Sequence, residues 1–135
     1  KKLEIIEKYK QLKSSLIIFE SGKRIHKTLK LINELYDPMT EICICRELTK
    51  KYEQIIRFKA ENFEVAMETF SSLKGEFVLI IGKNINPDLD WENLDKKIRQ
   101  YKKNNTLKST VALLAAEIKV SKSLIYKRAL KIFEE

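Results

Sequence analysis

The chain has 135 residues, of which 44% are hydrophobic and 34% are charged, a balance typical of a globular protein rather than a disordered one. No apolar run approaches the ~18 residues needed to cross a bilayer, and the charged opening carries no secretory signal, which favours a cytoplasmic protein. This length allows one domain, or one small domain with a helical appendage.

Residues 1–82 alternate predicted helices with predicted strands. The expected elements are a helix over 2–13, a strand over 16–19, a helix over 23–36, strands over 41–45 and 53–58, a short helix over 63–70 and a strand over 76–81. Ser21 and Asn62 are the expected N-caps of the second and third helices. Strand, helix and strand at this spacing predict a parallel, right-handed βαβ unit, so we expect a small α/β domain with a mixed sheet.

The stretch 41–59 is predicted to be a β-hairpin with an unusual connection. Ile42 and Ile44 alternate with two cysteines, but the charged residues 46–53 contain none of the Asn-Gly chemistry of a tight turn. Polar residues that turn geometry does not require often mark a functional loop, and a solvated charged loop is the simpler alternative.

The two cysteines, Cys43 and Cys45, lie two residues apart on the first strand of this hairpin. In extended backbone they cannot readily form a disulfide with each other, and they lack the further Cys or His ligands of a zinc site. We therefore expect buried reduced thiols and no metal centre.

Beyond residue 82 the sequence pattern becomes entirely helical. We expect a linker over 83–88 and a second domain over 89–135. The second domain is predicted to hold three helices, which start at Asp88 or Asp90, at Thr106 and at Ser121.

The last two of these helices have the character of a helix-turn-helix. Lys119 stands where such turns usually place glycine, so we expect a left-handed backbone at this residue. On the last helix, an outward mixture of lysine and tyrosine suits phosphate contact and base stacking, and its members are Lys122, Tyr126, Lys127 and Lys131. A three-helix cap that only packs is the alternative.

The net charge of +8 lies entirely in the last part of the chain. Residues 96–135 hold 11 Lys or Arg against three acids, whereas residues 1–95 balance. This asymmetry predicts a polyanion-binding surface, with a solvated lysine-rich face as the alternative.

Three segments together resemble the ribosomal RNA small subunit methyltransferase I family of the tetrapyrrole methylase superfamily. They are LIIFESGKRIHKTL, ICICRELTKKYEQIIRF with its RELTK signature, and KGEFVLIIG. The resemblance implies an enzyme that uses S-adenosylmethionine to methylate a cytidine ribose 2′-hydroxyl of small-subunit ribosomal RNA. It also implies two α/β halves with the cofactor between them, of which this sequence matches only the second half and the helical tail.

Because the first residue is Lys rather than Met, we expect a piece of a longer protein. The resemblance implies that this piece is inactive without the first half of the enzyme. By the same resemblance, the partners are small-subunit ribosomal RNA or the small ribosomal subunit, and a second copy in a homodimer. A non-catalytic nucleic-acid-binding module centred on residues 88–135 is the alternative function.

The resemblance also implies site residues. Cofactor contacts fall on Phe19, Glu20, Leu48, Thr49, Glu76 and Phe77. Glu47 and Lys50 are the candidates for removing the hydroxyl proton, on resemblance and polarity. The sequence departs from the family pattern at Gly22-Lys23, and the basic pair Lys23 and Arg24 near the cleft would suit an RNA phosphate. The lone histidine, His26, lies mid-helix among lysines and is expected to be a surface residue.

Overall fold

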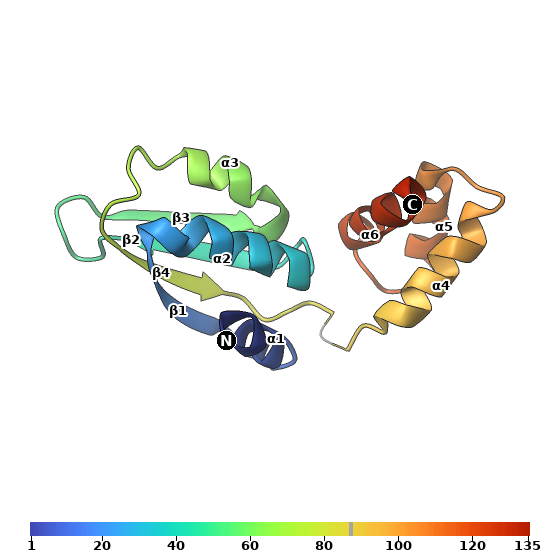
Figure 1. Cartoon of the computed structure of the whole chain (residues 1–135), viewed down its shortest axis with the longest axis horizontal. Helices are drawn as coiled ribbons and strands as arrows, with labels where there is room; N and C mark the ends of the chain where they lie inside the picture. The colour runs from blue at the N-terminus through green and yellow to red at the C-terminus, as the bar shows by residue number, and fades with distance from the viewer. Residues whose placement is uncertain (87) are drawn as a thin grey trace. The chain divides into compact units, whose positions relative to one another are not determined.

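The computed structural model describes residues 1–86 and 88–135. The chain divides into two units, Lys1–Pro87 and Asp88–Glu135 (Figure 1). Each unit has its own hydrophobic core, so each is described by itself.

The first unit contains the helices and strands that the sequence predicts, with small shifts at their ends. Its elements are α1 (Lys2–Lys10), β1 (Leu16–Ser21), α2 (Gly22–Leu35), β2 (Glu41–Arg46), β3 (Gln54–Lys59), the 3₁₀ turn η1 (Ala60–Asn62), α3 (Phe63–Glu68) and β4 (Glu76–Ile81). The prediction of a small α/β domain is therefore confirmed.

The sheet differs from the prediction in one respect. Its strand order is β1-β4-β2-β3, and every neighbouring pair is antiparallel, so the sheet is not mixed. β1 and β2 do run in the same direction, as a βαβ unit requires, but β4 lies between them. Since β4 buries Phe77, Leu79 and Ile81 on one face and half-buries Val78 and Ile80 on the other, it suits a central position.

One face of the sheet carries the core of this unit. α2 and α3 lie side by side against it, α2 over β1 and β4 and α3 over β3 (Figure 1). The largest fully buried side chains come from the sheet and α2, including Ile44, Leu79 and Leu29. On the opposite face, Phe19 is 82% exposed and Ile17 is 60% exposed.

The second unit is a three-helix bundle composed of α4 (Trp91–Lys102), α5 (Leu107–Glu117) and α6 (Lys122–Glu134). Each helix begins with a side-chain cap, because Asp90, Thr106 and Ser121 accept hydrogen bonds from backbone N–H groups three residues later. These three helix starts confirm the predictions made from the sequence.

Three local predictions are wrong. Lys119 has no left-handed backbone, since the non-glycine residues with positive φ in the described ranges are Glu47 and Thr49. The turn before α6 instead uses an extended Ile118, with φ −120° and ψ 144°. Ser21 and Asn62 form no side-chain cap bond with the helices they precede.

The segment after β4 is attached to the first unit. The buried Asn84 accepts from the backbone N–H of Asp37 at 3.1 Å, and Asn86 donates to the Asp37 carboxylate at 2.5 Å. Of the predicted linker, residue 87 lies outside the described residues. Within the described ranges, no helix has the length and apolar character required to cross a membrane.

Candidate functional site

The connection between β2 and β3, residues 47–53, forms an elbow that is tied to the start of β4. The backbone N–H of Glu47 donates to the carbonyl of Glu76 at 2.9 Å, and the N–H of Glu76 donates back to Glu47 Oε1 at 2.6 Å. Arg46 adds a bond from its Nε to the carbonyl of Lys74 at 2.9 Å. Because of these three bonds, the elbow stays beside the entrance of β4.

The elbow has an unfavourable backbone. Glu47 has φ 49° and Thr49 has φ 64°, a left-handed region that β-branched residues such as threonine rarely adopt. Residues held in such conformations often occur at functional sites, where the surrounding bonds impose them. Here Thr49 N–H donates to Glu53 Oε2 at 2.6 Å, and Lys50 N–H donates to the Glu47 carbonyl at 3.0 Å.

Gly75 is required at the point where Glu47 meets β4. Its φ is +108°, and a Cβ there would lie 2.7 Å from Glu47 Cδ and 2.9 Å from Glu47 Cγ. Only glycine leaves room for the Glu47 carboxylate at this position. Gly75 is not among the predicted site residues, although a glycine directly before the predicted strand at 76–81 is a usable signal.

The two predicted catalytic residues, Glu47 and Lys50, form an ion pair at 3.3 Å, and Lys50 also pairs with Glu76 at 2.9 Å. The hydrogen bond from the Glu76 backbone, with help from Lys50, lowers the pKa of Glu47. Bonds to Glu76 and Glu47 raise the pKa of Lys50. At neutral pH the pair is therefore carboxylate and ammonium, an arrangement suited to holding the elbow in place.

A hollow of about 580 Å³ opens where the elbow, β1 and β4 meet, and we call it the elbow hollow. It is lined by Phe19, Glu20, Ser21, Arg24, Leu48, Gly75, Glu76, Phe77 and Val78. Five of the six predicted cofactor residues are in this lining, and so is Arg24 from the predicted RNA set. The sixth, Thr49, lies in the elbow without lining the hollow, and Ser21 and Val78 were not predicted.

Glu20 is the buried charge beneath this hollow, with 6% of its surface exposed. Its Oε1 accepts from Ser21 N–H at 2.9 Å and Arg24 Nε at 3.0 Å, and its Oε2 accepts from Thr28 at 2.6 Å and from Lys2. Burial alone would raise the pKa of Glu20, but these four bonds lower it to about 2. Both carboxylate oxygens are therefore already engaged, so a ligand would meet the backbone at this residue.

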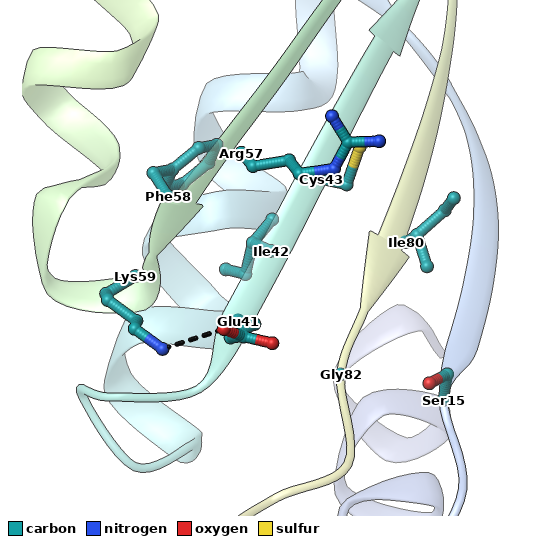
Figure 2. A pocket seen from close by; sticks show the side chains of 9 residues that line it. All are labelled: Ser15, Glu41, Ile42, Cys43, Arg57, Phe58, Lys59, Ile80 and Gly82. Atoms are coloured by element: carbon teal, nitrogen blue, oxygen red, sulfur yellow. Dashed lines mark hydrogen bonds and ion pairs between the residues drawn. The ribbon is translucent and has the colours of Figure 1, made fainter.

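A second hollow, of about 400 Å³, lies on the face of the sheet that the helices leave uncovered (Figure 2). Arg57 and Cys43 face each other there as cross-strand partners, and Lys59 pairs with Glu41 at 3.0 Å. None of the predicted site residues line it. Cys43 and Cys45 are free thiols with their sulfur atoms 3.8 Å apart, and burial raises the pKa of the Cys45 thiol.

The predicted RNA contacts of the second unit are not all on one side of α6. Lys122 and the half-exposed Tyr126 are one turn apart and lie together. Nine residues, about two and a half turns, separate Lys122 from Lys131, so these two side chains leave the helix on opposite sides. Lys127 lies between them on the helix surface and is half-buried.

Two further observations concern the lone histidine and possible metal ligands. His26 is half-exposed and bonds to Glu64 at 2.8 Å, which confirms its surface position. Among the residues that the structure describes, no three His, Cys, Asp or Glu side chains gather in a way that could hold a metal ion.

Comparison with known proteins identifies the relatives of this chain. It is 34% identical over 116 residues to the ribosomal RNA small subunit methyltransferase I of Rickettsia prowazekii (strain Madrid E), which covers 84% of the chain. It is 30% identical over 129 residues to the protein of the same name from Bacillus subtilis (strain 168), which covers 90%. The chain is homologous to ribosomal RNA small subunit methyltransferase I.

The chain matches only part of the length of each relative. The chain spans 40% of the Rickettsia methyltransferase I, 44% of the Bacillus one and 45% of that from Erythrobacter litoralis (strain HTCC2594). A solved structure of a cobalt precorrin-4 methyltransferase of cobalamin biosynthesis aligns with 57% of the chain at 22% identity and a TM-score of 0.47. No family model matches the sequence.

Proposed function

We propose that this chain is the C-terminal part of an S-adenosylmethionine-dependent methyltransferase that modifies a cytidine ribose 2′-hydroxyl of small-subunit ribosomal RNA. The observation that carries the proposal is the elbow hollow, because residues from three separate segments of the sequence line it together. Homology to methyltransferase I supports the reaction and the substrate class.

The lining of the hollow suits half of a nucleoside site. Phe19 is 82% exposed and Leu48 37% exposed, and with Val78 they offer apolar surface for an adenine ring. The volume of about 580 Å³ lies in the range of small-molecule sites. When bound, S-adenosylmethionine supplies an electrophilic methyl group on a sulfonium.

We assign Glu47 and Lys50 to positioning rather than to proton removal. Their ion pair and the bond from Glu76 N–H fix each of them in its charged form. A carboxylate with a lowered pKa is a weak base, and an ammonium with a raised pKa cannot accept a proton. Their contribution is to hold Leu48 against the start of β4.

The remaining part of the site is proposed to come from elsewhere in the full protein. The chain spans less than half the length of its relatives, and Phe19, which lines the elbow hollow, is left 82% exposed. We therefore propose that the chain alone binds S-adenosylmethionine weakly and does not methylate. The whole protein would act in the cytoplasm as a homodimer on ribosomal RNA or the small subunit.

A chimera tests this function directly. The chain replaces the matching segment of the Bacillus subtilis methyltransferase I, and transfer of labelled methyl to small subunits from a strain lacking the enzyme is measured. We expect activity in the chimera, loss of it with Phe19→Ala, and no activity for the chain alone. A folded chimera that neither binds S-adenosylmethionine by calorimetry nor methylates would contradict the proposal.

A second candidate is a nucleic-acid-binding module without catalysis, which is favoured by Lys122 and Tyr126 on one side of α6. Binding across a salt series separates the two. A preference for structured RNA over duplex DNA supports the methyltransferase assignment, and sequence-selective duplex binding supports the module.

A further inference from the structure

A groove of about 540 Å³ lies between α1 and α2, in the same unit as the elbow hollow. It is lined by Lys2, Leu3, Arg24, Lys27, Thr28, Lys30, Leu31 and Glu34. Four cations and one carboxylate line it, and two of the cations, Lys2 and Arg24, pair with the buried Glu20. Lys27 and Lys30 remain without an ion pair in the described residues, although residues 1–95 have no net charge. The groove is a local concentration of positive charge that a count along the sequence does not reveal.

The cations of α2 are aligned along one side of the helix. Lys23, Lys27 and Lys30 follow spacings of four and three residues, which places them within an arc of about 60°. All three are exposed, and none is in an ion pair within the described residues. Three uncompensated charges on one helix side form a track for a polyanion.

The track leads to the elbow hollow through a shared residue. Arg24 lines both the groove and the hollow, and its Nε is fixed by Glu20 at 3.0 Å. The same buried carboxylate binds Lys2 from α1, so Glu20 joins the two helices at this end of the groove. A chain of phosphates held along α2 would therefore deliver its next nucleotide to the hollow.

We propose that the α1–α2 groove binds the RNA backbone and guides the target nucleotide toward the elbow hollow. Lys27 and Lys30 contact phosphates, and Leu3 and Leu31 give the groove an apolar floor. This rests on the proposed function in one respect, namely that the substrate is RNA. It places substrate binding on the sheet-bearing unit, in addition to any contact made by the helical tail.

The test is fluorescence anisotropy of the 135-residue chain with a labelled 20-nucleotide single-stranded RNA, between 50 and 200 mM salt. Lys27→Gln with Lys30→Gln removes two phosphate contacts, which should reduce the slope of log K against log salt by about 1.4. At 0.1 M salt this corresponds to binding about 25-fold weaker. The matched control is Lys13→Gln with Lys83→Gln, two exposed lysines outside the groove.

The outcomes separate the two proposals. Weaker binding by the groove variant with an unchanged control supports the groove. Equal binding by both variants overturns the groove and leaves the RNA substrate standing. No binding by the unmodified chain also overturns the groove, and the proposed function is then decided by the chimera assay. As a second measurement, crosslinks from 4-thiouridine RNA should map to residues 2–10 or 22–35, and crosslinks confined to 107–135 would also overturn the groove.

Discussion

Replacing Gly75 with alanine should selectively destabilise the first unit. The new Cβ would lie 2.7 Å from Glu47 Cδ, so the carboxylate must turn away and lose its 2.6 Å bond from Glu76 N–H. A side chain held at φ +108° costs about 1–3 kcal/mol of strain, and the displaced carboxylate adds to this loss, so we expect a loss of about 2 kcal/mol or more.

Urea unfolding measures this loss, because the two units have different probes. Trp91, the single tryptophan, is partly buried and packs against the core of the second unit, while far-UV circular dichroism reports both units. With a slope of about 1 to 1.5 kcal/mol per molar urea, a loss of about 2 kcal/mol should lower the transition of the first unit by about 1.3 to 2 M. The Trp91 transition should stay in place. Lys74→Ala is the control, and a shift below about 0.5 M for Gly75→Ala would refute the reasoning.

Three other outcomes are expected. The pKa of Glu20 falls from 4.5 to about 2 on folding, so about 3 kcal/mol of stability is present above pH 4.5 and is lost toward pH 2. In acid titration of the unfolding free energy, Glu20→Gln should remove this dependence. Arg128→Lys should weaken the second unit by about 1 kcal/mol in Trp91 fluorescence, because a bidentate pair with Asp95 is lost. Lys122→Gln should lower RNA affinity more than Lys131→Gln in the same salt series, and equal effects would contradict the proposed side of α6.

Apolar periodicity and polar caps made most of the elements predictable. Period-two alternation identified the strand at 41–46, and Asp90, Thr106 and Ser121 marked three helix starts that the structure has. These signals work because each depends on residues close in sequence.

The order of strands was not predictable in this way. A strand, helix and strand in sequence predict neighbours, but the position of β4 depends on pairing with strands more than 30 residues away. β4 is apolar on both faces, which suits a strand with neighbours on both sides. This property alone does not say which strands those neighbours are. Local sequence therefore predicted that β1 and β2 run in the same direction, but it did not predict that β4 lies between them.

The elbow shows a different limit. Charge and the RELTK signature pointed to residues 46–53, but nothing in the sequence reports that Glu47 and Thr49 have positive φ. That conformation exists because bonds with Glu76 and Glu53 impose it, and both of these partners lie outside the RELTK signature. Gly75 is the sign of this arrangement in the sequence, because its missing Cβ leaves room for the side chain of Glu47, 28 residues earlier.

The charge of the chain gives the clearest contrast between counting and geometry. The sequence places all of the net charge after residue 95, yet several of those cations are neutralised locally. The ion pairs are Lys96–Glu92, Lys97–Glu117, Arg99–Glu135 and Arg128–Asp95. α2 lies in a region of zero net charge and still presents aligned lysines without ion pairs in the described part of the chain. Because a phosphate responds to the charges within a Debye length of about 10 Å, the RNA site proposed here depends on the arrangement of lysines on one helix side more than on the regional total.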